Sequence, residues 1–298
     1  MTGICAGLIV FHPLFTAEAP AVDRRDFPCT HHGRIPEGPW DLIKAKSGQD
    51  GTTGMRATRP APRLFVPPKF VNFREPPREY VGRPAGGWKI WLERELAAQH
   101  AELAGRALGR LDAKLRELLR LLPAHTHARL QRLPIFLMLG KEAQAGGRDS
   151  GAEYFQPHAP KHRAHLDPRW SSALVVYSAR NYTAITDEWA LRVLIHEFAH
   201  AWQLEQWAEK QPDILAAWKN AVARKLYEGV RDVTGGRLDR AYASRNQLEY
   251  FAELSCAYFL SGEYEPFDRK ALRCRDPAGF AMIEKMWGVH APQPEPTR

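Results

Sequence analysis

The stretch Leu191–Trp207 reads LRVLIHEFAHAWQLEQW and sets two histidines four residues apart within an apolar run. On a helix, residues i and i+4 lie one above the other, so His196 and His200 can present their imidazoles to a single point. Glu197 follows His196, and its carboxylate can reach a metal-bound water without taking a coordination position. This HExxH arrangement is typical of zinc sites in which the glutamate acts as a general base.

The residues around the motif favour metal binding over a chance match. The helix would be buried almost all round, through the apolar side chains of Leu191, Val193, Leu194, Ile195, Phe198, Ala199 and Trp202. Unpaired imidazoles and a carboxylate in such a helix would cost on the order of several kcal/mol. A bound metal ion removes that cost, so we predict a metal site here.

Two histidines do not complete a tetrahedral catalytic site, which needs a third protein ligand and an open position. The extended pattern HExxHxxGxxH is absent, so the third ligand must lie further along the chain. The segment Tyr242–Phe259, YASRNQLEYFAELSCAYF, carries Glu249 and Glu253 on one face of an otherwise apolar helix. One can be a ligand and the other can orient a ligand imidazole. The alternative is that both are solvated glutamates on an outer face.

The order HEFAH and then Y-x6-E-x-F-A-E resembles the catalytic domain of anthrax lethal factor and of the Pro-Pro endopeptidases, which are gluzincin-type zinc metallopeptidases. The longer pattern is similar to a group of bacterial metallopeptidase-like proteins with ARNY, EYFAELxxAYF and MWGV segments. In this chain these segments are Ala179–Tyr182, Glu249–Phe259 and Met286–Val289. The resemblance spans roughly Leu133–Val289.

The resemblance implies three ligands for one catalytic zinc ion, namely His196, His200 and Glu249. It also implies that Glu197 is the general base and that Glu253 stands behind a ligand histidine. Tyr242 matches a tyrosine that faces the attacking water and the substrate carbonyl, where a phenol can donate to a developing oxyanion. The alternative for Tyr242 is a packing aromatic.

Composition divides the chain into unequal parts. Residues 1–87 hold 12 of the 23 prolines and 10 of the 22 glycines, and we expect a separate, irregular Pro/Gly-rich region there. We expect residues 88–290 to form an α+β, helix-rich zincin-like metallopeptidase domain with a small sheet. Residues 291–298 are expected to be a disordered tail.

Hydrophobic periodicity predicts the elements of this domain. Apolar residues at three- and four-residue steps predict a long helix over Trp88–Leu122. Short apolar runs predict strands at Leu133–Gly140 and Ala173–Ala179, and we expect an extended peptide to add beside the second of them. Thr186 is predicted to be the N-cap of the HExxH helix. Three further helices are predicted over Asp213–Tyr227, Asn246–Leu260 and Pro277–Met286, and a turn is predicted at Thr234–Arg237.

Several other features have simpler interpretations. A second metal site at His158, His162 and His165 is less favoured than surface histidines, and His125-x-His127 is expected to be a polar loop. The four cysteines show no CxxC and no zinc-ribbon spacing. A disulfide between Cys256 and Cys274 is possible, and the sequence does not decide whether it forms.

The distribution of charge and the length of the apolar runs bear on whether the protein binds nucleic acid or crosses a membrane. The net charge of +8 divides evenly, +4 in residues 1–87 and +4 in the remainder, which argues against a nucleic-acid partner. No apolar run approaches the roughly 20 residues of a membrane span. Residues 1–21 have some features of a signal peptide for a secreted or periplasmic protein but lack a basic n-region; otherwise the chain would be cytoplasmic.

The expected function is therefore hydrolysis of a peptide or protein substrate. Two alternatives stay open. One is a zinc-binding zincin-like protein without catalytic activity, with a structural or binding role. The other is a metallopeptidase that acts on DNA-bound partners, which strong salt-dependent DNA binding would support. The substrate, the cleavage preference, the role of residues 1–87 and the oligomeric state do not follow from the sequence.

Overall fold

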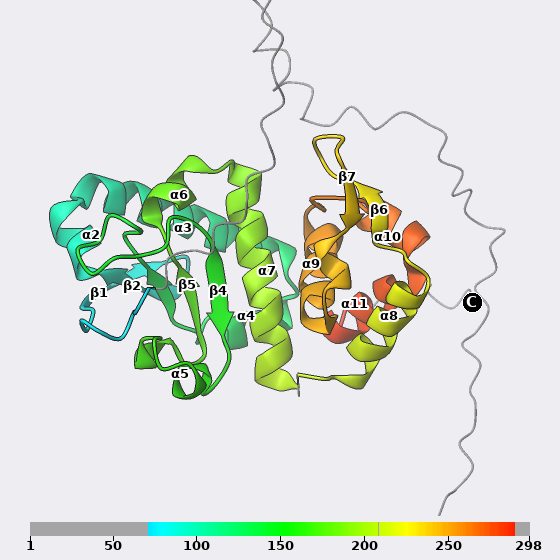
Figure 1. Cartoon of the computed structure of the whole chain (residues 1–298), viewed down its shortest axis with the longest axis horizontal. Coiled ribbons are helices and arrows are strands. Elements are labelled where there is room, and N and C mark those ends of the chain that lie inside the picture. Colours follow the sequence, from blue (N-terminus) through cyan, green and yellow to red (C-terminus); the bar gives the residue numbers. More distant parts are fainter. Residues whose placement is uncertain (1–70, 208, 290–298) are drawn as a thin grey trace, which may run out of the picture. The chain divides into compact units, whose positions relative to one another are not determined.

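The computed structural model describes residues 71–207 and 209–289 of the chain, which belong to one compact unit. A mixed sheet has the strand order β1-β2-β3-β5-β4 (Figure 1). Its strands are β1 (Tyr80–Ala85), β2 (Trp88–Glu93), β3 (Ile135–Leu137), β4 (Ala152–Phe155) and β5 (Ala173–Val176). The three central strands are parallel, whereas β1 and β4 pair antiparallel at the two edges. Helices and sheet together confirm a mixed α+β class.

Helices make up most of the remaining described structure. The α-helices are α2 (Arg94–Gln99), α3 (Ala101–Leu121), α4 (Ala124–Leu130), α5 (Ala159–His162), α6 (Ala179–Ala184), α7 (Asp187–Gln206), α8 (Pro212–Ala223), α9 (Gln247–Phe259), α10 (Arg269–Arg275) and α11 (Pro277–Trp287). Two short 3-10 helices are η1 (Pro168–Trp170) and η2 (Tyr242–Ser244), and a hairpin is formed by β6 (Glu228–Arg231) and β7 (Arg237–Arg240).

The predicted helix over Trp88–Leu122 is wrong in its first six residues, which form β2. Trp88, Ile90 and Leu92 are buried while Lys89 is exposed, and this alternation is the two-residue period of a strand. Gly86 and Gly87 both have positive φ and join β2 to β1 in a tight hairpin. The helical part begins only at Arg94.

The N-terminal boundary also differs from the expectation. Tyr80–Ala85, within the region expected to be irregular, forms an edge strand of the sheet, and Phe73 is buried in the core. Gly82 and Pro84 are both unfavourable within strands, which explains why no strand was predicted here. Residues 1–70 and the predicted tail at 291–298 lie outside the described residues.

The predicted start of the HExxH helix is confirmed. The Thr186 side chain accepts a hydrogen bond from the Trp189 backbone N–H, as an N-cap does, and α7 then runs without a break to Gln206. Asn246 caps α9 in the same way. The helix predicted over Asp213–Tyr227 is shorter than expected, because α8 ends at Ala223.

Helix α7 is fixed on both of its sides, since it packs against β4 and α3 and also against α9 (Figure 1). The Phe198 ring lies 5.4 Å from the Trp88 ring of the sheet. The Trp202 ring stacks on that of Trp287 in α11, with 5.5 Å between centroids and 7° between planes. The chemistry-bearing face of α7 is therefore held rigidly between two packed layers.

Strand β5 is not the edge at which a peptide could add. It pairs with β3 on one side and with β4 on the other, so the free edge near α7 belongs to β4. The expectation that a peptide adds beside Ala173–Ala179 is therefore wrong. Its apolar content instead reflects burial at the centre of a sheet.

Smaller expectations are corrected or settled as well. His125 and His127 lie in helix α4 and not in a loop. Cys256 is buried in α9, Cys274 is exposed in α10, and no disulfide joins the two. Among the described residues, no helix combines the length and the apolar character that crossing a membrane requires.

Candidate metal centre

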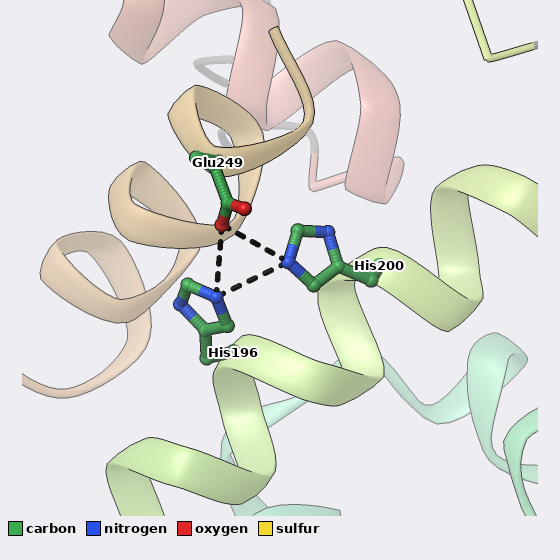
Figure 2. Close-up of side chains that lie close together, drawn as sticks. All are labelled: His196, His200 and Glu249. Atoms are coloured by element: carbon green, nitrogen blue, oxygen red, sulfur yellow. Dashed lines mark hydrogen bonds and ion pairs between the residues drawn. The ribbon is translucent and has the colours of Figure 1, made fainter. Parts of the chain in front are cut away.

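Three side chains from two helices converge at one point, as Figure 2 shows. His196 and His200 of α7 point their Nε2 atoms at each other across 3.1 Å. The Oε2 atom of Glu249, from α9, lies 3.3 Å from each of these nitrogens. The two helices bring together residues that are about fifty positions apart, as predicted from the sequence.

Local structure places each of these groups. The i, i+4 spacing puts both imidazoles on one face of α7. At the start of α9, the Asn246 side chain accepts hydrogen bonds from the backbone N–H groups of Leu248 and Glu249. Glu249 therefore lies in the first turn of α9, where the helix dipole also favours a carboxylate.

The three groups fit a metal ion. Glu249 Oε2 is buried and has no hydrogen bond of normal geometry, although two imidazole nitrogens lie close to it. Ligand atoms about 2 Å from a tetrahedral ion lie about 3.3 Å apart, which matches the three separations here. An ion at their centre would satisfy atoms that otherwise lack good partners.

Within residues 71–207 and 209–289, this is the sole group of three or more such side chains arranged to hold a metal ion. His158, His162 and His165 do not form such a group, and the His158 and His162 side chains are exposed. His158 and His162 belong instead to the wall of the neighbouring cleft.

Glu253 lies behind His196. Its Oε1 atom is 2.9 Å from Nδ1 of that imidazole, and the carboxylate is buried. A carboxylate can only accept, so Nδ1 carries a proton, and Nε2 is the atom left to coordinate a metal ion. Glu253 thus fixes the tautomer that a metal ligand needs.

Arg192 is a part of this arrangement that the sequence analysis missed. Its guanidinium is buried, lies 2.7 Å from Glu253 Oε2, and also donates to the Ser261 carbonyl. Arg192, His196 and His200 follow one another at four-residue steps on α7. They face Glu253 and Glu249 on α9, and we call these five residues the polar ladder. The sequence signal that could have revealed it is the spacing: Arg192 lies four residues before His196 and therefore on the same face of the helix.

Electrostatics within the ladder favour charged carboxylates. Burial alone would raise the pKa of Glu249, but the imidazoles of His196 and His200 beside its carboxylate outweigh burial and hold that pKa well below its usual value. For Glu253, burial is likewise outweighed by the Arg192 charge and by His196, and its pKa is also lowered. Both carboxylates are therefore ionised near neutral pH.

Glu197 lies on the same helix but contacts the sheet. Its Oε2 atom accepts a hydrogen bond of 2.7 Å from the backbone N–H of Tyr154 in β4, and the side chain is only 8% exposed. The Tyr154 hydroxyl bonds to Glu205, two turns further along α7. Strand β4 is thus attached to α7 at two points, one of which is the predicted base.

Tyr242 stands at the opposite side of the three-residue group and is exposed. Its hydroxyl donates to Glu249 Oε1 at 3.0 Å and accepts from Arg245 Nη1, also at 3.0 Å. The Tyr242 ring lies 6.2 Å from that of His196. The structure therefore places Tyr242 against the group and not in the hydrophobic core.

A cleft of about 770 Å³ opens along α7 over these residues. The three converging side chains, Glu197 and Leu204 line it from α7 and α9. One wall is formed by β4 with the segment that follows it, and the other by Tyr242, Arg245 and Leu248. All candidate groups except the buried Glu253 and Arg192 therefore face one solvent-accessible space.

Comparisons with known proteins add no relative to this description. The chain matches no protein-family model, no curated protein and no solved structure.

Proposed function

We propose that this protein is a zinc-dependent metallopeptidase of the gluzincin type. One observation carries the proposal: the HExxH imidazoles meet Glu249 of a second helix at ligand spacing, in a cleft that also holds Glu197. A zincin-like relationship fits the motif, the mixed fold and the edge strand beside α7. The neutral imidazoles and single carboxylate suit zinc among the common divalent ions.

In the proposed site, His196, His200 and Glu249 hold the ion. When bound, zinc supplies Lewis-acid chemistry, which activates a water molecule and polarises a carbonyl group. Glu253 keeps His196 in the ligand tautomer, and Arg192 holds Glu253 in place. The contribution of the chain is thus to orient His196 before the ion arrives, whereas the buried Nδ1 atom of His200 has no hydrogen-bond partner among the described residues.

Glu197 is the proposed general base. One of its carboxylate oxygens is held by the Tyr154 N–H, which leaves the other to take a proton from the attacking water. The same carboxyl then returns a proton to the leaving amine. The Glu197 carboxylate is therefore oriented by a backbone N–H group and not by another side chain.

Tyr242 is proposed to stabilise negative charge on the substrate oxygen. Its hydroxyl bonds to Glu249 in the free protein and is exposed at the cleft, so it can turn its proton toward a substrate carbonyl. A phenol at that place lowers the barrier by donating where charge develops.

The substrate is proposed to lie as an extended strand beside β4. The Tyr177 N–H donates to the Gly151 carbonyl, so odd-numbered residues of this segment bond inward to β5. Alternate residues of a strand point their backbone groups in opposite directions, so those of Ala152 and Tyr154 face away from β5. Because Glu197 already accepts from the Tyr154 N–H, the groups available to a substrate are those of Ala152 and the Tyr154 carbonyl. This edge of β4 lines the cleft, as strand addition of a peptide requires.

The test compares the wild type with Glu197→Gln, which keeps an oxygen acceptor for Tyr154. Both proteins should bind about one zinc ion per chain by elemental analysis. Only the wild type should cleave a proteome-derived peptide mixture, with the variant at least about a hundredfold slower. Glu249→Gln should lose both properties.

If both proteins bind zinc and neither cleaves any peptide, the site is a structural or binding one. If neither binds zinc, the proposed ligand set is wrong.

A further inference from the structure

The charged groups along the cleft are unequally partnered. Glu153 of β4 is neutralised by Arg163 at 2.7 Å and also by Arg148, and it accepts a hydrogen bond from Tyr177. Arg163 therefore already has a carboxylate. Arg245, on the opposite wall, is exposed, and no carboxylate among the described residues lies within ion-pair distance of it.

The environment of Arg245 fixes its position without neutralising it. Its Nη1 donates to the uncharged hydroxyl of Tyr242 at 3.0 Å, and its guanidinium carbon lies 5.4 Å from the centre of the same ring. Stacking and a single hydrogen bond leave most of its N–H donors available. A planar guanidinium held in this way is suited to binding a carboxylate through two hydrogen bonds.

The location sets which part of a substrate could be reached. Two consecutive hydrogen bonds of 3.0 Å connect Arg245 through Tyr242 to Glu249 Oε1, which belongs to the same carboxylate as the proposed ligand oxygen Oε2. An extended peptide advances about 3.3 Å per residue. Arg245 is thus within about two residues of the bond that the proposed site would cleave.

We propose that Arg245 selects substrates that carry an aspartate or glutamate within about two residues of the cleaved bond. This inference rests on the proposed peptidase function for the location of that bond. It assigns to Arg245 the role of a specificity residue that binds the substrate carboxylate. Tyr242 orients its guanidinium.

The first experiment measures binding by metal-free full-length protein carrying Glu197→Gln, so that no zinc contact or cleavage contributes. The probes are two fluorescent decapeptide pools, one rich in Asp and Glu and the other with Asn and Gln at the same positions. The acidic pool should bind about tenfold more tightly, and Arg245→Gln should remove this difference.

A matched control removes the same charge elsewhere. Arg83 is exposed on β1, at the opposite edge of the sheet from β4, and does not line the cleft. Arg83→Gln should leave the preference for the acidic pool within about twofold of its original value. Equal binding of the two pools, or equal losses in Arg245→Gln and Arg83→Gln, would overturn the inference.

The second experiment profiles the peptide bonds that the zinc-loaded wild type cleaves. Asp and Glu should be enriched within two residues of the cleaved bond, and Arg245→Glu should replace that enrichment by Lys and Arg. Cleavage without acidic enrichment contradicts the role of Arg245 but leaves the proposed peptidase function intact. If no peptide is cleaved, the proposed function fails, and the binding experiment alone decides whether Arg245 recognises carboxylates.

Discussion

His196 Nδ1 and Glu253 Oε1 lie 2.9 Å apart across the interface of α7 and α9. This contact joins the helix that carries two of the candidate ligands to the helix that carries the third. It also leaves His196 Nε2 free to face Glu249. The polar ladder therefore runs through the interface between these two helices.

Zinc should stabilise the folded wild type. A ligand at a hundred times its dissociation constant adds about 2.7 kcal/mol to the free energy of unfolding, which is roughly 5–10 °C in melting temperature for a domain of this size. Glu249→Ala should not show this shift, because one of three ligands is missing. The melting temperature with and without zinc measures both. An equal shift in the variant would exclude Glu249 as a ligand.

Loss of Arg192 should weaken metal binding although Arg192 touches none of the ligands. Without the guanidinium, Glu253 no longer has a fixed position and cannot orient His196. Arg192→Met should reduce zinc affinity about 10- to 100-fold, the range for partners behind a ligand, and Glu253→Gln should do the same. Competition with a coloured chelator gives the affinity.

Arg110→Met is the matched control. Arg110 is also largely buried, but it donates to the Tyr182 and Ile185 carbonyls and does not belong to the polar ladder. It should lower stability but keep zinc affinity. Comparable affinity losses in Arg110→Met and Arg192→Met would mean that the effect is one of general destabilisation.

The link between Tyr154 and Glu205 should be measurable as a coupling energy. Tyr154→Phe removes only the hydroxyl that bonds to Glu205, and Glu205→Met removes the carboxylate that accepts this bond. A double-mutant cycle from urea unfolding should give a coupling of about 1–2 kcal/mol. A coupling near zero would show that β4 is held to α7 by packing and by the Glu197 contact alone.

Asp276 should be among the most sensitive positions for stability. It is fully buried and accepts from the hydroxyls of Tyr227 and Tyr250 and from the Gly279 N–H. Asp276→Ala leaves two buried hydroxyls unpaired and should cost roughly 3–5 kcal/mol in unfolding free energy. Asp276→Asn retains an acceptor, so denaturant unfolding should show a smaller loss. Similar losses in both variants would point to packing as the main contribution.

The sequence predicted the local elements whose signals lie within a few residues. Thr186 marked the start of α7, and Asn246 the start of α9, because capping depends on neighbouring backbone groups alone. Glu249 and Glu253 were placed near the motif by their shared face on an apolar helix. The structure has both against the imidazoles, whereas their chemical roles stay predictions.

Other features depend on contacts between distant segments and could not be predicted. The strand character of Trp88–Glu93 was masked by helical spacing that continues from Leu92 into the next helix. Which strand is at the sheet edge depends on pairing order, and the apolar content of β5 gave no sign that β4 covers it. The Tyr154 contact of Glu197 involves a backbone N–H, which no side-chain pattern records.

The hydrogen bond from the Tyr154 N–H to Glu197 affects how copies of this protein could associate. An unpaired strand edge is a common starting point for aggregation. Strand β4 is only four residues long, and one of its outward N–H groups is already occupied by a buried carboxylate. The edge therefore keeps enough free backbone for a short substrate segment but not for a long ladder with a neighbouring chain. The residue proposed to activate water thus also limits unwanted strand pairing at this edge.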